Sequence, residues 1–234
     1  YKAFCPGPIT FILNKKPKSK ISPIATAKKK TIAVRFPKHL ATRKLLSILK
    51  LPLAAPSANV SSKLSPTSPD DVVDEFKNKI KFILDGGRSK IGLESTIIDL
   101  TNNEKILRPG SITPKKIEKV LKKKIKICKN NKKIISPGQL KKHYYPGIPV
   151  ILSMNNPKGD EAVIGFGKRF KTGKNYYNLS KNGNLYEAAN SLYKTLRKIK
   201  NKGYKSIIVN KIPNIGIGIA INDRLKRAST KWTI

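Results

Sequence analysis

The sequence contains few of the residues that build metal sites or covalent cross-links. Its 234 residues include two cysteines, Cys5 and Cys128, and two histidines, His39 and His143. No CxxC pair occurs, and the histidines lie far from both cysteines, so the ligand spacing of a structural zinc site is absent. This is not the composition of a small disulfide-bonded secreted scaffold, and we expect both thiols to be reduced.

Long apolar runs are also absent. No run approaches the ~18–20 residues that a membrane-spanning helix requires. Residues 1–10 lack the basic stretch followed by an apolar stretch that marks a signal peptide. We therefore expect no membrane association and a cytoplasmic location. With 38% apolar residues, the chain is long enough for one large domain or two modest ones.

Acidic residues are scarce: 13 Asp and Glu oppose 50 Lys and Arg, which gives a net charge of +37. Such a field attracts polyanions, including RNA and nucleotides. However, only eight of these basic residues are arginine, the residue suited to bidentate phosphate recognition. Lysine scattered over a solvated surface explains the charge equally well, so charge alone does not identify a partner.

The predicted elements divide the chain into three parts, at residues 1–124, 125–147 and 148–234. In the first part, apolar runs predict strands, and 3.6-residue spacing or caps predict helices: strands 9–13, 31–36, 81–84, 95–100 and 105–107, and helices 40–50, 68–79 and 113–123. The middle part, rich in Lys, Asn, Pro and Gly, reads as a linker. The third part predicts a small, mostly parallel sheet, with strands 149–153, 162–166 and 206–209 and helices 184–199 and 217–229.

Helix starts are marked by capping residues. Ser68 followed by Pro69 and two acids is typical of a first helical turn. Asn184 with Glu187 three residues later predicts a capping box. In the last helix, the pair Asp223 and Arg224 suits either a ligand-facing turn or an ordinary surface ion pair.

Four segments of the first part combine hydroxyls, an amide or arginine with fixed turns: CPGPIT (5–10), TIAVRFP (31–37), PLAAPSANVS with SPT (52–67), and GLESTIID with LRPG (92–110). Such turns can present hydroxyl and N–H groups to phosphate oxygens, and the arginines can fork onto a carboxylate or phosphate. The P-loop pattern GxxxxGK[ST] is absent, so any use of ATP follows another geometry. Taken singly, each segment also fits an ordinary turn or a solvated arginine.

In this order and spacing, the segments resemble the YrdC-like threonylcarbamoyl-AMP synthase family. PGPIT is similar to its PGPxT turn, TIAVRFPKH to its VRxPxH strand, and LAAPSANVSSKLSPT to its PLxAPSANxSGxxSPT signature. SPGQLKKHYYP resembles the linker of the family's long form. The resemblance implies an α/β fold: a YrdC-like twisted mixed sheet with helices in an incomplete catalytic domain (1–124), a linker (125–147) docking near the active site, and a small Rossmann-like C-terminal domain (148–234).

The resemblance also implies a nucleotidyltransferase reaction. L-Threonine, bicarbonate and ATP give threonylcarbamoyl-AMP and pyrophosphate, and a tRNA threonylcarbamoyl-transfer complex uses the product for N6-threonylcarbamoyladenosine modification. The threonine amine captures CO2 as a carbamate, whose oxygen attacks the α-phosphate. Catalysis would rest on positioning and charge neutralisation, with Mg2+ shielding the phosphates of ATP. No nucleophile or general base of the protein is implied.

Roles follow from the resemblance by position. Four positions match ATP contacts: Thr31, Ser57, Ser65 and Arg108. At Lys141 the family usually has an aromatic residue, and we expect this lysine to contact the phosphates of ATP. Three match positions around the threonine: Arg35, which would pair with its carboxylate, Ala55 and Ser95. Asn59 is expected in the Mg2+–phosphate region, and no residue is expected to bind the metal directly.

Two departures from the family pattern stand out. Ser62 replaces the usual glycine of SANxSG, which we expect to be tolerated only if its backbone avoids positive φ. The family's Lys/Arg-rich N-terminal motif has no counterpart after Tyr1 and is expected upstream of it. The 234-residue chain alone is therefore expected to release no pyrophosphate.

Three alternatives remain open. The first is a YrdC-like protein that binds tRNA or double-stranded RNA without synthase activity, which the positive charge favours. The second is a carbamoyl-adenylate-forming domain of hydrogenase maturation, which the lack of a Cys-rich segment opposes. The third is an inert paralogue. For the C-terminal domain we expect a scaffold that positions the linker.

Overall fold

The computed structural model describes residues 1–128, 143–153, 157 and 159–229. The chain forms two compact units, each built from two separate stretches of sequence. The first unit comprises Tyr1–Pro56 and Glu94–Gln139, and the second comprises Ser57–Leu93 and Leu140–Ile234. Compactness thus groups residues 57–93 with the C-terminal part, whereas the boundaries 1–124, 125–147 and 148–234 rest on sequence and stay predictions.

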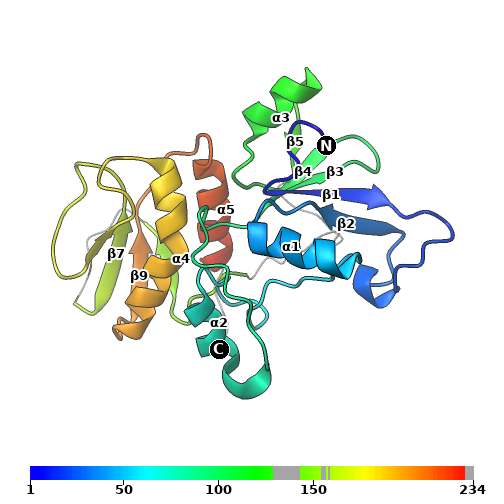
Figure 1. Cartoon of the computed structure of the whole chain (residues 1–234). Coiled ribbons are helices and arrows are strands. Elements are labelled where there is room, and N and C mark those ends of the chain that lie inside the picture. The colour runs from blue at the N-terminus through cyan, green and yellow to red at the C-terminus, as the bar shows by residue number, and fades with distance from the viewer. Residues whose placement is uncertain (129–142, 154–156, 158, 230–234) are drawn as a thin grey trace. The chain divides into compact units, whose positions relative to one another are not determined.

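The first unit is organised around a five-stranded mixed sheet in the order β2-β1-β3-β4-β5 (Figure 1). Parallel pairs join β1 to β3 and β4 to β5, and antiparallel pairs join β1 to β2 and β3 to β4. The strands are β1 (Ile9–Asn14), β2 (Thr31–Arg35), β3 (Thr96–Asp99), β4 (Lys105–Arg108) and β5 (Lys126–Ile127). The first four confirm predicted strands, whereas the two-residue β5 is too short to produce a sequence pattern.

Helix α3 (Pro114–Leu121) contributes to the apolar cluster on one face of this sheet. Its N-terminus is capped as predicted, because the Thr113 hydroxyl accepts a hydrogen bond from the Lys116 N–H at 3.4 Å. Ile117 of α3 packs with a buried cluster from the sheet: Ile9, Phe11, Ile98, Ile106 and Ile125. Side chains alternate along a strand, so the smaller cluster Ile12, Ile97 and Leu107 marks the opposite face. Thr10 shares that face with Ile12.

Helix α1 (Leu40–Leu49) forms where the leucine spacing predicted it. It begins after His39 and ends at Lys50, whose φ of 53° is left-handed. None of its ten residues is buried, so its periodicity identified the helix but not a core contact.

The second unit contains an all-parallel sheet in the order β6-β9-β7-β8, and Figure 1 shows α4 and α5 running beside it. Its elements are β6 (Val150–Leu152), β7 (Glu161–Gly165), β8 (Tyr176–Asn178), α4 (Leu185–Asn201), β9 (Ser206–Val209) and α5 (Gly218–Ala228). The predicted buried stripe of α4 is confirmed at Ala188, Leu192, Leu196 and Ile199. No helix in the described part of the chain is long and apolar enough to cross a membrane.

The start of α4 departs from the predicted capping box. The Asn184 carboxamide oxygen accepts from the N–H groups of Tyr186 and Glu187 at 2.8 and 3.3 Å, as expected of a cap. Glu187 does not reach back to the Asn184 N–H. The Ser180 hydroxyl stands between them, accepting from that N–H at 2.9 Å and donating to the Glu187 carboxylate at 2.6 Å.

The Asp223–Arg224 pair is not an ordinary surface pair. Arg224 is 1% exposed, and its guanidinium lies 5.2 Å from the centre of the Tyr144 ring. Asp223 contacts Arg224 at 2.6 Å and Arg227 at 3.1 Å. Tyr144 is itself 1% exposed and stacks on Tyr193 with ring centres 5.8 Å apart. The aromatic segment of the predicted linker is therefore anchored in the core of the second unit.

The structure also overturns a predicted strand in the second unit. Residues 81–84 form no strand, and the Phe82 side chain is 92% exposed. An apolar run becomes a strand only when a neighbouring strand edge accepts its hydrogen bonds, and no described strand pairs with it. The preceding helix is confirmed, as α2 (Pro69–Phe76) followed by a 3₁₀ turn at Lys77–Lys79.

Ser62 contradicts the expectation that its backbone avoids positive φ, because its φ is 70°. Its carbonyl accepts from the Tyr145 N–H at 2.9 Å, beside the bridge between Lys63 and Tyr145, and this contact holds the conformation in place. A non-glycine residue in the left-handed region costs about 1 kcal/mol.

We expect Ser62→Gly to raise the free energy of unfolding, because glycine adopts this φ without strain. The gain is about 0.5 kcal/mol once the greater chain entropy of glycine in the unfolded state is subtracted. Urea denaturation would measure it. Ser61→Gly, at the neighbouring position without positive φ, is the matched control and should not stabilise. Equal effects of the two variants would show that the backbone at Ser62 is not strained.

Candidate functional site

Ser95 is the centre of a polar cluster in the first unit. It directly precedes β3 and is 4% exposed. Its hydroxyl is hydrogen-bonded to the Thr10 hydroxyl at 2.7 Å and accepts from Nη2 of Arg108 at 3.1 Å. Its carbonyl accepts from Nε of the same arginine at 3.1 Å. Two hydrogen bonds thus fix the direction of the Arg108 guanidinium and leave further donors for a ligand.

A β-bulge directs Arg108 onto this face. Ile97 pairs with Arg108 while Ile98 pairs with Ile106, so Leu107 is an extra residue on β4. With two residues opposite one, both Leu107 and Arg108 lie on the side of Ile97. Regular alternation would have sent Arg108 to the α3 side of the sheet. The bulge therefore brings a buried guanidinium, 8% exposed, to the face that carries Thr10 and Ser95.

The turn after Arg108 requires Gly110 because two backbones approach closely there. A Cβ at Gly110 would lie 2.5 Å from the backbone N of Thr96 and 2.8 Å from the carbonyl of Glu94. The Thr96 hydroxyl connects the same two segments, because it donates a hydrogen bond to the Ile112 carbonyl at 2.8 Å. Residues 108–110 (RPG) and residues 94–96 (EST) thus pack directly against each other.

Arg35 faces the same side of the sheet from β2. It pairs directly with Thr10 across the antiparallel ladder, and directly paired residues share a face. Arg35 and Arg108 are three strand spacings apart at the backbone, about 14 Å, but their long side chains approach each other. Partial burial, and then the charge of Arg108, lower the pKa of the Arg35 guanidinium, which remains charged as arginine does in proteins.

Arg35 and Arg108 have no acidic partner in the part of the chain that the structure describes. Among the described residues, no carboxylate forms an ion pair or hydrogen bond with Arg35 or Arg108. Two cations that repel each other across one sheet face form a site for an anion. The arrangement suits a carboxylate or phosphate group and needs no protein nucleophile.

The other predicted residues of the first unit do not join this cluster. Thr31 is at the opposite end of β2, paired with Asn14. It lies four residues from Arg35, about 13 Å along the strand. Ala55 is exposed in the segment after α1. Of the four predicted residues in this unit besides Ser95, only Arg35 and Arg108 are therefore brought together with it.

Three predicted residues, Ser57, Asn59 and Ser65, belong to the second unit. Ser57 is exposed, whereas Ser65 is 8% exposed. The Asn59 amide donates to the carbonyls of Val60 at 2.9 Å and Lys63 at 3.1 Å, which closes the PSANVSS loop. Its carboxamide oxygen is buried without a hydrogen-bond partner among the described residues. Lys141 lies outside the described residues.

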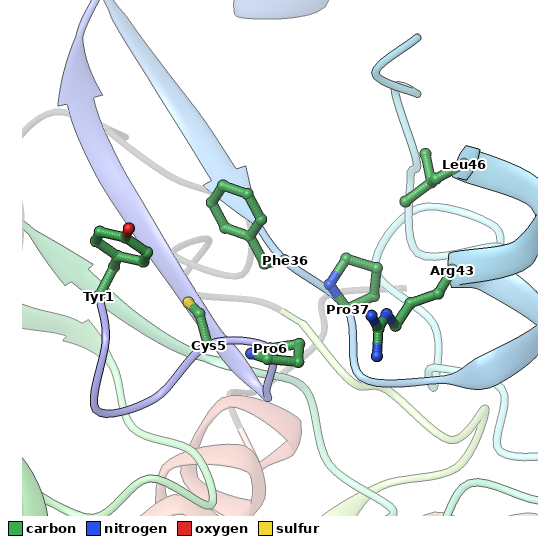
Figure 2. Close-up of a pocket in the computed structure, with 7 residues that line it drawn as sticks. All are labelled: Tyr1, Cys5, Pro6, Phe36, Pro37, Arg43 and Leu46. Carbon is green, nitrogen blue, oxygen red and sulfur yellow. The ribbon is translucent and has the colours of Figure 1, made fainter. Parts of the chain in front are cut away.

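A hollow of about 350 Å³ lies in the first unit, at the end of β2. Figure 2 shows Arg43 reaching from α1 towards Pro37, with Tyr1, Cys5 and Phe36 along the other side. Apart from Arg43 the lining is almost wholly apolar, and none of the predicted site residues contributes to it. The hollow adjoins the turn that carries Pro6, whose peptide bond with Cys5 is cis, and it is separate from the Ser95 cluster.

Sequence reasoning did not assign a role to two residues that hold these segments. Thr10 was visible only as the last residue of the PGPIT motif, and its contact with Ser95 spans 85 positions. Arg197, on α4, contacts the segment of Ser65 from 132 positions away, and no motif marks it. In the described residues, no group of three or more His, Cys, Asp and Glu could hold a metal ion.

Family models match nearly the whole chain. Residues 1–110 match the model described as Telomere recombination, which carries the names Sua5, YciO and YrdC. Residues 112–230 match the model described as Threonylcarbamoyl-AMP synthase, C-terminal domain. The two models meet near residue 111, within the first compact unit.

Curated relatives and a solved structure agree with these models. The threonylcarbamoyl-AMP synthase of Pyrococcus abyssi is 36% identical, over 97% of this chain and 72% of the relative. That of Bacillus subtilis is 34% identical, over 97% of this chain and 71% of the relative. The crystal structure of P. abyssi Sua5 complexed with L-threonine has a TM-score of 0.86 at 33% identity, covering 97% of this chain and 72% of that one. The predicted fold class is thereby confirmed, and the chain belongs to the threonylcarbamoyl-AMP synthase family of nucleotidyltransferases.

Proposed function

We propose that Arg35 and Arg108 bind the anionic groups of the substrates in threonylcarbamoyl-AMP synthesis, the carboxylate of L-threonine at Arg35 and the phosphates of ATP at Arg108. The observation that carries this proposal is the pair of guanidiniums on one sheet face without an acidic partner among the described residues. A guanidinium fork matches both carboxylate and phosphate oxygens. The P. abyssi structure with L-threonine supports the choice of amino acid.

Positioning accounts for the chemistry. The threonine nitrogen forms a bond to CO2 derived from bicarbonate and loses a proton, which gives a carbamate. A carbamate oxygen then attacks the α-phosphorus of ATP, and the bond to the β-phosphate oxygen breaks to release pyrophosphate. Arg35 and Arg108 hold two negative reactants close together, which their mutual repulsion would otherwise prevent. The Ser95 hydroxyl keeps the Arg108 guanidinium oriented.

Mg2+ fits this site as a companion of ATP. Magnesium usually keeps several waters and binds through substrate phosphates, so a protein cage of carboxylates is not needed. The carboxamide oxygen of Asn59, in the second unit, is buried without a partner among the described residues, and the role of this residue in the Mg2+–phosphate region stays a prediction. The ion would neutralise phosphate charge when bound.

The remaining assignments stay predictions. Thr31, Ser57, Ser65 and Lys141 are predicted to contact ATP, and Ala55 and Ser95 to lie around the threonine. Transfer of the product to a tRNA-modifying complex, and direct binding of RNA, are likewise predictions. A salt-dependent gel shift with tRNA would test the second of these.

The proposal can be tested with L-threonine and L-threoninol, in which an alcohol replaces the carboxylate. Isothermal titration calorimetry of the chain should show binding of L-threonine at one site. L-Threoninol should bind at least about 10-fold more weakly, because it has no carboxylate to pair with Arg35. ATP should bind more tightly with Mg2+ than with a chelator present. Equal affinities for the two amino-acid ligands would contradict the role of Arg35, and no binding of either substrate would contradict the proposed function.

A further inference from the structure

Helix α4 contacts the segment that contains Ser65, and Arg197 makes that contact. Nη2 of Arg197 donates to the carbonyls of Leu64 and Ser65, both at 3.0 Å. Nη1 of the same guanidinium lies 3.2 Å from Oδ2 of Asp71. The Arg197 side chain thus connects the backbone at the start of the SPT turn (residues 65–67) to the first turn of α2.

Asp71 completes the network at the other end of that turn. Its Oδ2 accepts from the N–H of Thr67 at 2.6 Å, the Thr67 hydroxyl at 2.9 Å and the N–H of Ser68 at 3.1 Å. Burial alone would raise the pKa of the Asp71 carboxyl, but the hydrogen bonds from Thr67 and Ser68 and the charge of Arg197 together lower that pKa. The charged pair Arg197 and Asp71 therefore forms hydrogen bonds with both ends of the segment 64–68.

A second contact from α4 holds the neighbouring segment. The Asn190 amide donates to the Ser89 carbonyl at 2.8 Å, and the Ser89 N–H donates to the Thr67 carbonyl at 2.8 Å. Gly92 lies directly against α4, since a Cβ there would be 2.5 Å from the Cα of Asn190. Residues 64–71 and residues 89–92 thus contact each other, and both contact helix α4.

We propose that Arg197 is a positioning residue for ATP: by binding the carbonyls of Leu64 and Ser65 it fixes the backbone at Ser65, so that this residue is held where it contacts the nucleotide. The inference rests on the proposed function and on the predicted contact of Ser65 with ATP. Only a planar fork can serve two carbonyls and a carboxylate at once, which a lysine ammonium cannot reproduce in the same geometry. Burial lowers the pKa of the Arg197 guanidinium, and the charge of Asp71 opposes that shift, so the pair holds its geometry as charged partners.

The test uses Arg197→Met and Arg197→Lys, with Lys198→Met as matched control. Lys198 is exposed on the same helix without a described partner, so its loss removes the same charge but none of these contacts. Titration calorimetry would give the affinities for ATP with Mg2+ and for L-threonine, and thermal denaturation the melting temperature. We expect Arg197→Met to weaken ATP binding about 10-fold or more. L-Threonine binding should change less than about twofold, because Arg35 and Ser95 belong to the other unit.

The lysine variant separates positioning from folding. Arg197→Lys should recover most of the melting temperature through its contact with Asp71 while ATP binding stays weak. ATP affinity that follows the melting temperature across all variants, or that is as strong in Arg197→Met as in Lys198→Met, would overturn the inference and leave the proposed function intact. Failure of the unmodified chain to bind ATP would overturn both.

Discussion

Replacing Gly92 by alanine is expected to lower the free energy of unfolding of the second unit by about 3 kcal/mol. Gly92 has a φ of 77°, and a Cβ there would lie 2.5 to 2.8 Å from the Cα of Asn190 and the carbonyls of Ala189 and Asn190. The left-handed backbone accounts for about 1 kcal/mol of the loss. The remainder comes from displacing the backbone of α4, which cannot move away as a flexible side chain would.

Gly87→Ala is the matched control for this prediction. Gly87 has a φ of 73° but no atom within 4 Å of its ideal Cβ. It should therefore lose only the left-handed backbone cost, about 1 kcal/mol. Urea denaturation followed by far-UV circular dichroism would measure both variants. A Gly92→Ala variant no less stable than Gly87→Ala would mean that the segment before Ser95 does not pack on α4.

Arg35→Ala is expected to weaken L-threonine binding by about 10- to 100-fold, because hydrogen bonds between charged groups contribute about 1.5–3 kcal/mol. The Arg35 side chain is only partly buried and has no acidic partner among the described residues. Its removal should therefore leave the melting temperature nearly unchanged. L-Threoninol has no carboxylate, so the variant should bind it as tightly as the unmodified chain does. The variant should therefore bind L-threonine and L-threoninol with equal affinity.

Lys38→Ala is the control for charge. Lys38 is exposed three residues after Arg35 and carries the same charge, but it lies beyond the end of β2. Calorimetric titration of both variants distinguishes a specific ion pair from a general effect of the positive surface. An equal loss of L-threonine affinity in the two variants would contradict the assignment of the carboxylate to Arg35.

Local sequence patterns predicted most of the elements. Ser68 and Pro69 marked the start of α2, Thr113 and Pro114 the start of α3, and the apolar stripe identified α4. These signals succeed because caps and periodicity act within a few neighbouring residues. The failure at residues 81–84 has the complementary reason: a strand depends on a partner edge elsewhere in the chain, and apolar composition does not reveal whether that edge is present.

The site could be predicted less completely than the fold. Motif resemblance selected Arg35, Ser95 and Arg108, which the sheet brings to one face. It missed Thr10 as a contact of Ser95. It also expected the Ser62 backbone to avoid positive φ, whereas Ser62 adopts a left-handed φ and its carbonyl accepts a hydrogen bond from Tyr145. Residue type identifies what a side chain can bind, but not which neighbours orient it.

The sequence by itself determined the family, most of the helices and strands, and the set of hydroxyl and guanidinium groups available to an anionic substrate. Only the tertiary structure decided that a bulge turns Arg108 towards Ser95, and that Arg197 holds Ser65 from 132 residues away. The physical reason is range. Propensities, caps and turns depend on neighbouring residues, whereas the direction of a buried arginine depends on strand register and on carbonyls that only folding brings within reach.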